Sequence, residues 1–164
     1  MRYGEKVDEN PSPGNKEGGI TTLEDKALGC TQKCGTAPVE DVLSYGEAAK
    51  KKGLSLLQAP GNDLVAANAL AVSGAQLILF TTGRGTPFGC PVPTAKISSN
   101  SALAEKKKSW IDFNAGVLLE DKNMSELTDE FLTYILKLAS GEARTKSEAL
   151  DKHELAIFKD GVTL

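Results

Sequence analysis

The stretch that decides the fold runs from residue 54 to residue 80 and reads LSLLQAPGNDLVAANALAVSGAQLILF. The apolar run 54–57 predicts a short buried strand. Residues 63–73 follow Asn62 as a cap and are apolar almost all round, which predicts a buried helix. Residues 76–80 form the strongest strand in the sequence. Short turns between the three predict a βαβ unit with parallel strands.

Further elements are predicted on both sides of this stretch. Helices are expected over residues 21–35, 36–43, 100–108, 124–140 and 147–155, and strands over residues 95–98 and 110–113. The helix 124–140 has the clearest signals, with Asn123 as its cap and Gly141 after its end. The strand 95–98 is expected to be weaker than the strand 76–80. Together these elements predict an α/β fold, a Rossmann-like three-layer sandwich with a mainly parallel sheet.

Composition limits the classes of function. At 164 residues the chain is expected to hold one α/β domain over residues 20–164, preceded by a glycine- and proline-rich loop segment over residues 1–19. A net charge of −3 argues against nucleic-acid partners. Apolar stretches are too short for a membrane span, the first residues lack a signal-peptide core, and three cysteines do not suggest a disulfide framework. We therefore expect a cytoplasmic protein without membrane or nucleic-acid partners.

The strand 76–80 leads directly into a glycine-rich loop, Thr81-Thr82-Gly83-Arg84-Gly85-Thr86-Pro87-Phe88-Gly89. Ligands of open parallel sheets bind beyond the carboxyl ends of the strands. Glycines permit close backbone approach, threonines offer hydroxyls, and Arg84 can hold a carboxylate with two parallel hydrogen bonds. These residue types predict an oxyanion cradle; the alternative is a structural turn in which Arg84 pairs with a nearby acid. The glycine spacing matches neither a Walker loop nor a dinucleotide fingerprint.

A second glycine-rich segment lies near the N-terminus, Asn10-Pro11-Ser12-Pro13-Gly14-Asn15-Lys16-Glu17-Gly18-Gly19. Its prolines restrict the backbone, its glycines permit positive φ, and Asn15 and Lys16 present hydrogen-bond donors. Two interpretations stay open from the residues alone: a rigid binding loop and a disordered linker.

The cysteines and the single histidine are weaker candidates for chemistry. Cys30, Cys34 and Cys90 together could hold an iron–sulfur cluster, but they lack CxxC spacing, and the first two fall on an apolar helical stripe. We therefore expect buried structural thiols. His153 lies among charged residues without a triad motif, which predicts a solvated side chain. The run Lys106–Lys108 is expected to be a solvated helix end.

The two glycine-rich segments together resemble the altronate dehydratase/galactarate dehydratase family. The similarity extends to Leu28-Gly29-Cys30-Thr31-Gln32-Lys33, to Trp110-Ile111-Asp112-Phe113-Asn114-Ala115-Gly116 and to Gly161-Val162-Thr163-Leu164, which look more like the altronate branch. It covers nearly the whole chain but only the C-terminal part of the family's longer proteins. The resemblance therefore implies one domain of a larger enzyme, or a subunit of a split enzyme such as sulfolactate sulfo-lyase.

The resemblance implies a carbon–oxygen hydro-lyase that removes water from altronate or galactarate to give a 2-keto-3-deoxy acid. From the resemblance we expect three catalytic residues, Lys16, Arg84 and Lys96. We expect the substrate to be bound by Asn15, Thr82, Gly83, Gly85 and Thr86. Arg84 and the neighbouring amides would hold the carboxylate, and Lys16 or Lys96 would be the base if burial lowers its pKa.

The resemblance also implies iron(II) or another divalent metal as cofactor. One histidine and scattered acids do not make a metal site here, so most ligands are expected in the remaining N-terminal and middle regions or in a partner subunit. The isolated domain is then expected to be inactive. Two alternatives stay open, a stand-alone sugar-acid or anion-binding module and a structural or oligomerisation domain, and the number of subunits, including a homo-oligomer, is also open.

Overall fold

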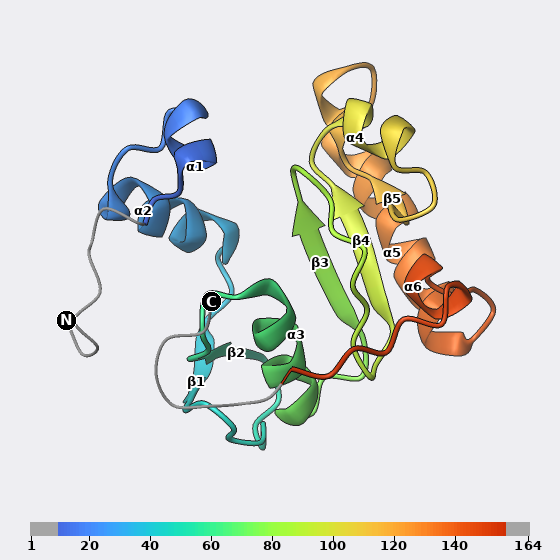
Figure 1. Cartoon of the computed structure of the whole chain (residues 1–164). Coiled ribbons are helices and arrows are strands. Elements are labelled where there is room, and N and C mark those ends of the chain that lie inside the picture. Colours follow the sequence, from blue (N-terminus) through green and yellow to red (C-terminus); the bar gives the residue numbers. More distant parts are fainter. Residues whose placement is uncertain (1–9, 157–164) are drawn as a thin grey trace. The chain divides into compact units, whose positions relative to one another are not determined.

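The computed structural model describes residues 10–156, and Figure 1 shows its elements in chain order. They are α1 (Pro13–Glu17), α2 (Leu23–Lys33), β1 (Val39–Leu43), β2 (Leu54–Leu57), α3 (Asp63–Val72), β3 (Ile78–Thr82), β4 (Thr94–Ser98), α4 (Ser101–Lys106), β5 (Phe113–Asn114), the 3-10 helix η2 (Gly116–Leu119), α5 (Met124–Ser140) and α6 (Lys146–Ala149). The described residues fall into two units, 10–42 with 51–56, and 43–50 with 57–156. This division does not follow the expected boundary between residues 19 and 20, because α2 and β1 group with the N-terminal segment.

The second unit is built on a parallel sheet with the strand order β3-β4-β5. β3 and β4 pair along their full length, from Ile78 opposite Thr94 to Thr82 opposite Ser98. β5 is shorter than the predicted strand 110–113 and pairs only with the end of β4. The sheet confirms the predicted α/β class with parallel strands.

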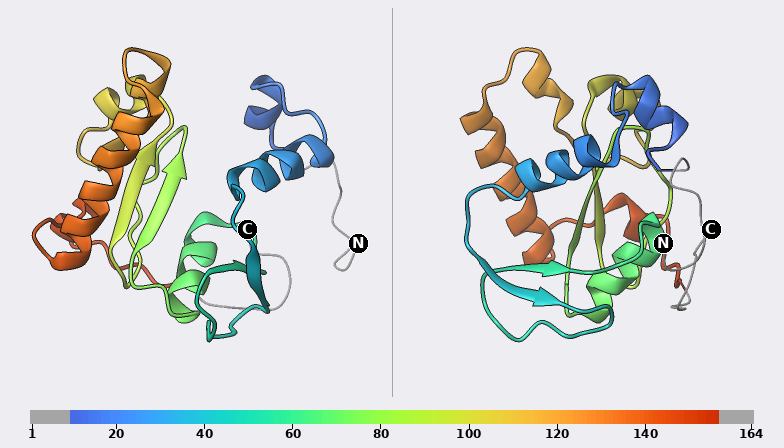
Figure 2. Two further views of the ribbon diagram at one scale, coloured as in Figure 1. Left: turned by 180° about the vertical axis from the view of Figure 1, so that it is seen from behind. Right: turned by 90° about the vertical axis from the view of Figure 1, so that its left-hand side faces the viewer.

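Both faces of this sheet are covered. On one face, α3 and the glycine-rich loop (residues 81–89) contribute to a buried apolar cluster of Ala67, Ile78, Phe88 and Cys90. On the other face, α5 lies along the strands (Figure 2). There the ring centres of Phe131 from α5 and Phe113 from β5 are 4.9 Å apart. The second unit thus has the predicted Rossmann-like arrangement of three layers.

β4 is buried along its whole length, including Thr94, Lys96 and Ser98. The sequence predicted a weaker strand here, because lysine and hydroxyl side chains dilute the apolar signal. The central place of β4 between β3 and β5 explains the difference, since both of its edges are hydrogen-bonded.

The βαβ unit predicted over residues 54–80 is wrong in its strand pairing. β2 pairs with β1 and β3 pairs with β4, so the described sheets do not join the two strands that flank α3. The parallel crossover that does form is β4–α4–β5. The strands and the helix lie close to where they were predicted, but a strand's partner depends on tertiary contacts that local patterns do not record.

In the first unit, residues 39–43 form the strand β1 and not the predicted short helix. Val39 and Val42 are β-branched and favour extended backbone, although their spacing also fits a helical turn. Glu40 lies close to Gly53, where an added Cβ would stand 2.7 Å from the Glu40 Cγ. The Lys51 ammonium is 3.2 Å from the Asp41 carboxylate.

The main predicted helices are confirmed with their caps. Asn62, Asn100 and Asn123 each accept a hydrogen bond from the amide three residues further on, which starts α3, α4 and α5. α5 begins and ends as predicted, and Gly141 follows it with a φ of 77°. α2 is capped by Thr22, one residue later than expected.

The remaining predictions concern the C-terminal region. α6 is shorter than the predicted helix 147–155, and the predicted tail from residue 157 lies outside the described residues. None of the helices within residues 10–156 has the length and apolar character needed to cross a bilayer.

Candidate functional site

The carboxyl ends of β3, β4 and β5 meet at one edge of the sheet. Thr82, Ser98 and Asn114 are neighbours in the strand register at this edge. The glycine-rich loop leaves β3 there, and α4 begins shortly after β4. Because ligands of open parallel sheets bind at this edge, it is the candidate site of the second unit.

Side chains from the sheet and from α4 fix the start of the glycine-rich loop. The Thr82 Oγ1 accepts hydrogen bonds from the amides of Gly85 at 2.9 Å and Arg84 at 3.4 Å. The Asn100 side-chain amide donates to the Gly83 carbonyl at 3.1 Å. Gly85 has a φ of 78°, in the left-handed region that favours glycine. The Gly85 amide is therefore hydrogen-bonded within the turn, and Arg84 lies between the two glycines.

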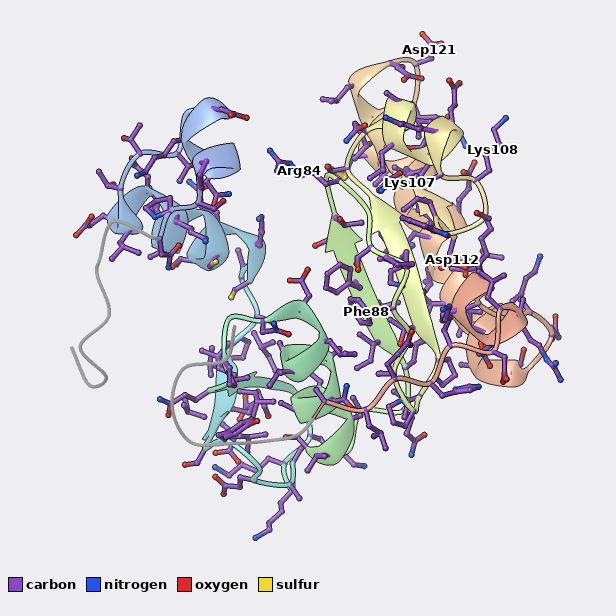
Figure 3. All side chains as sticks on the ribbon, in the orientation of Figure 1. Arg84, Phe88, Lys107, Lys108, Asp112 and Asp121 are labelled. Atoms are coloured by element: carbon purple, nitrogen blue, oxygen red, sulfur yellow. The ribbon has the colours of Figure 1, made fainter. Side chains whose placement is uncertain are left out.

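Arg84 occupies the tip of this turn. Its side chain is exposed, and Figure 3 shows it projecting outward from the loop. A guanidinium is permanently charged and offers paired donors, so this position suits capture of a carboxylate from solution.

Lys107 lies across the loop at Gly85, near Arg84 (Figure 3). A Cβ added at Gly85 would stand 3.1 Å from the Lys107 Cδ, so the absence of a side chain leaves room for the lysine stem. The Lys107 ammonium is 4.4 Å from the ring centre of Trp110, a cation–π contact. The edge of the loop therefore carries a second positive charge held in a defined place.

A polar network lies beneath the loop at the ends of β4 and β5. The Ser98 hydroxyl donates to the Asn114 side-chain oxygen at 3.1 Å, and the Asn114 side-chain nitrogen donates to the Ser101 hydroxyl at 2.9 Å. The Gly116 amide donates to the same Asn114 oxygen at 2.9 Å. A Cβ at Gly116 would lie 2.4 Å from the Asn100 Cα, so only glycine fits there. The network holds α4 and the turn after β5 together at the candidate site.

The far end of the loop is held by Lys96 and Glu154. Lys96 is 1 % exposed; its ammonium donates to the Phe88 carbonyl and lies 4.6 Å from the centre of the Phe88 ring. The Gly89 amide donates to the Glu154 carboxylate at 2.9 Å, and the Glu154 amide donates back to the Gly89 carbonyl at 3.1 Å. Residues 88 and 89 are thus bound from the sheet side and from the C-terminal side.

Burial dominates the electrostatics around Lys96. Burial lowers the pKa of Lys96, while the negative charges of Asp112 and Glu154 act in the opposite direction. Burial raises the pKa of Asp112, although its carboxylate accepts hydrogen bonds from the amides of Lys96 and Lys146, both at 2.7 Å. The hydrogen bond from the Gly89 amide lowers the pKa of Glu154.

The sequence profile described as D-galactarate/Altronate dehydratase, C-terminal, matches residues 1–163 of the chain. The chain belongs to this family.

Relatives in the dehydratase family span a range of similarity. The altronate dehydratases of Bacillus subtilis and Escherichia coli are each 59% identical over 100% of this chain. The galactarate dehydratase (L-threo-forming) of Escherichia coli is 38% identical over 91% of it, and the (2R)-sulfolactate sulfo-lyase subunit beta of Chromohalobacter salexigens is 34% identical over 91%. The chain spans 33% of the length of the two altronate dehydratases and 39% of the sulfo-lyase subunit.

For this dehydratase-family chain, the structure brings together most of the predicted site residues of the second unit. Thr82, Gly83, Arg84 and Gly85 share one turn, and Thr86 follows it half-buried. Lys96 lies at the other end of the loop, against Phe88.

Asn15 and Lys16 belong to the first unit, where the predicted loop forms the short helix α1. The Asn15 side-chain oxygen accepts from the Ser12 amide at 3.2 Å, and the Ser12 Oγ accepts from the Asn15 amide at 3.4 Å, which makes a capping box. Lys16 lines a groove of about 440 Å³ together with Asn10 and Thr22. Asn15 therefore contributes to the helix start in addition to any contact with a ligand.

The expectation of buried thiols holds for Cys90 and is wrong for Cys30 and Cys34. Cys90 is 1 % exposed, with its Sγ 3.2 Å from the Thr94 hydroxyl. Cys30 and Cys34 are exposed, because α2 has no buried residue among those described. His153 is exposed beside Asp151 at 3.3 Å, as its charged neighbours predicted.

Metal ligands do not gather in the described part of the chain. Residues 10–156 contain no group of three histidine, cysteine, aspartate or glutamate side chains placed to hold an ion. The side chains of these residues do not by themselves fit a divalent metal, because such an ion requires several of these ligands at once.

Several features of the site were not predicted from the sequence: the polar network of Ser98, Ser101 and Asn114, and the positions of Lys107 and Glu154. A polar residue at the end of each predicted strand was a usable signal for Ser98 and Asn114. Lys107 was expected to be solvated with its neighbours, but it is half-buried while Lys106 and Lys108 are exposed. Only tertiary contacts reveal Lys107 and Glu154.

Proposed function

We propose that the chain is the C-terminal part of a hydro-lyase that removes water from a sugar acid to give a 2-keto-3-deoxy acid. The observation that carries the proposal is the similarity to dehydratases along the full chain, 59% for two altronate dehydratases. Identity falls to 38% for the galactarate enzyme and 34% for the sulfo-lyase subunit, so altronate is the favoured substrate.

The residues at the candidate site suit the chemistry of such an elimination. Removal of a proton next to a carboxylate places negative charge on the carboxylate oxygens as an enediolate. Fixed positive charge at those oxygens lowers the barrier. In the proposal, Arg84 binds the carboxylate at the loop tip, beside the Lys107 ammonium that Gly85 admits.

The other candidate residues take supporting roles in the proposal. Thr82, Gly83, Gly85 and Thr86 shape the turn and face substrate hydroxyls, and Asn15 stays a candidate for substrate binding on the family resemblance alone. Lys16 stays a candidate base on the family resemblance alone, since its side chain is exposed and not buried as that role was expected to need. Lys96 satisfies one requirement of a base, since burial lowers its pKa. Its ammonium, however, donates a hydrogen bond to the Phe88 carbonyl.

Dependence on iron(II) or another divalent metal is part of the proposal only for the complete enzyme. The described residues do not fit a metal by themselves, so the ligands are proposed to lie mostly outside this chain, and none of the steps above uses them. The relatives are about three times longer, which supports the proposal that further regions of the same polypeptide or a partner subunit complete the site. A cytoplasmic location is proposed on the same family grounds.

The test is an assay of the complete dehydratase that contains this chain, supplied with altronate, galactarate or sulfolactate in turn. The expected result is 2-keto-3-deoxy acid from altronate, with a higher kcat/KM than for galactarate. Release of sulfite from sulfolactate would instead assign the sulfo-lyase activity. Binding of altronate without turnover under every metal condition would favour the sugar-acid-binding module and contradict the proposal.

A further inference from the structure

The end of the glycine-rich loop is held more tightly than a surface turn requires. Gly89 exchanges two hydrogen bonds with Glu154, one from its amide to the side-chain carboxylate and one to its carbonyl from the Glu154 amide. Its neighbour Phe88 accepts from the buried Lys96 ammonium. The carboxylate and amide of Glu154 and the ammonium of Lys96 thus hold two adjacent residues, Phe88 and Gly89. Phe88 lies six positions after β3 ends at Thr82.

Glycine at position 89 is part of this arrangement. A Cβ there would lie 2.3 Å from the carbonyl oxygen of Lys152 and 3.0 Å from its carbonyl carbon. The segment Lys152–Glu154 therefore crosses directly over the loop backbone. A backbone contact of this kind cannot be relieved by turning a side chain, so the two segments move together.

The crossing segment is itself anchored in the core of the second unit. Asn68, on α3 and 2 % exposed, donates to the Glu154 carbonyl at 3.3 Å and to the Leu64 carbonyl at 2.9 Å. The segment 152–156 has no helix or strand of its own. Its described hydrogen bonds run to Gly89, to Asn68 and to α6. It is thus placed to hold the loop.

The charges of Lys96 and Glu154 support one another across Phe88 and Gly89. Glu154 acts to raise the pKa of Lys96, and Lys96 acts to lower the pKa of Glu154, so each favours the charged form of the other. Asp112 contributes a further negative charge near Lys96. The ammonium and the carboxylate therefore hold adjacent residues of the same loop end, and their opposite charges attract each other.

We propose that Lys96 and Glu154 are positioning residues, a clasp on Phe88 and Gly89 that sets the loop so that Arg84 meets the substrate carboxylate. The proposal rests on the function proposed for the loop. It gives Lys96 a role different from that of a base, because its ammonium acts on the loop backbone and not on the substrate.

The first test uses the complete dehydratase with Glu154→Ala, Glu154→Gln and Glu148→Ala. Glu148 is the matched control, since its carboxylate accepts a backbone hydrogen bond from Thr145 at 2.8 Å to cap α6 and has no described hydrogen bond to the loop. We expect Glu154→Ala to raise the KM for altronate on the order of tenfold with a smaller change in kcat. Glu154→Gln keeps an acceptor for the Gly89 amide and should restore KM to near wild type. Equal KM values in Glu154→Ala and Glu148→Ala would overturn the proposal.

The second test is amide hydrogen exchange across residues 81–89 in the same variants and in Lys96→Met. Faster exchange confined to the loop is expected for Glu154→Ala and Lys96→Met, and not for Glu148→Ala. If Lys96 is the base, Lys96→Met loses kcat while loop exchange stays at the wild-type rate, which contradicts the clasp. If the complete wild-type enzyme dehydrates no sugar acid, the proposed function fails, while the exchange measurement still decides whether the clasp exists.

Discussion

At the scale of single residues, two glycines of the candidate site stand where backbone from elsewhere occupies the place of a side chain. A Cβ at Gly89 would lie 2.3 Å from the Lys152 carbonyl oxygen, and one at Gly116 would lie 2.4 Å from Asn100 backbone atoms. By contrast, a Cβ at Gly61 meets nothing within 4 Å. The loss of stability on replacing a glycine is therefore expected to differ sharply between positions in the same unit.

Gly89→Ala is expected to destabilise the second unit by roughly 2 kcal/mol or more, because the backbone of residues 152–154 must move to admit the methyl group. Thermal unfolding followed by circular dichroism measures the change. Gly61→Ala is the control and should change stability by less than about 1 kcal/mol. Equal effects of the two substitutions would contradict the described crossing.

Residue types alone identified the turn at Thr82–Gly85 as a candidate site, because glycines, a threonine and an arginine follow the strongest strand. They did not identify Glu154, which reaches the loop from 65 residues downstream, or Asn68, whose side chain on a preceding helix donates to the Glu154 carbonyl. Long-range hydrogen bonds leave no periodic trace in a sequence. This part of the site could come only from the structure.

At the scale of elements, the helices were predictable because each has its start signal in the sequence. Asn62 and Asn123 cap α3 and α5 as predicted, and Asn100 caps α4 in the same way. Strands lack such signals, and β1 was mistaken for a helix because Val39, Val42 and Leu43 fit either period. Strand pairing was misassigned for β2 for the same reason, since a partner strand is chosen by packing.

Asn123→Ala is expected to lower the free energy of unfolding by about 1 kcal/mol, because the Glu126 amide loses its acceptor at the start of α5. Asn123→Asp keeps a side-chain oxygen there and should retain most of the stability. Chemical denaturation of the purified chain measures both. A loss in the aspartate variant as large as in the alanine variant would contradict the capping role.

The Glu154 contact makes the C-terminal segment sensitive to acid. The pKa of Glu154 is lowered in the folded chain, chiefly by the Gly89 amide, so its stabilising effect is present above the ordinary glutamic acid pKa and is lost as pH falls through the folded value. The difference in melting temperature between wild type and Glu154→Gln should therefore shrink as pH falls from about 7 to about 3. A difference that stays constant over this range would show that the carboxylate is not ionised in the contact.

At the scale of the whole molecule, the chain holds a candidate carboxylate-binding edge, and metal ligands are not grouped in its described part. It spans 33% of the length of the altronate dehydratases it resembles. The family could be predicted from the sequence because long motifs of mixed residue type are specific. The division into two units could not, since it depends on which segments pack together.

The purified chain alone is expected to be inactive toward altronate and to contain no iron–sulfur cluster after anaerobic preparation. The Cys90 thiol is buried against Thr94 and is not presented to a cluster, whereas Cys30 and Cys34 are exposed on α2. Iron and acid-labile sulfide analysis, together with a turnover assay, checks both statements. Iron and sulfide at about one cluster per chain would contradict the described place of Cys90.

Arg84 is the group proposed to meet the substrate carboxylate, and the proposed function depends on it more than on any other residue. The direct measurement is kcat/KM for altronate in the complete dehydratase carrying Arg84→Ala, with the exposed Arg144→Ala as a control for loss of charge. We expect Arg84→Ala to lower kcat/KM on the order of a hundredfold or more, with Arg144→Ala near wild type. Wild-type kcat/KM in a correctly folded Arg84→Ala enzyme would contradict the account.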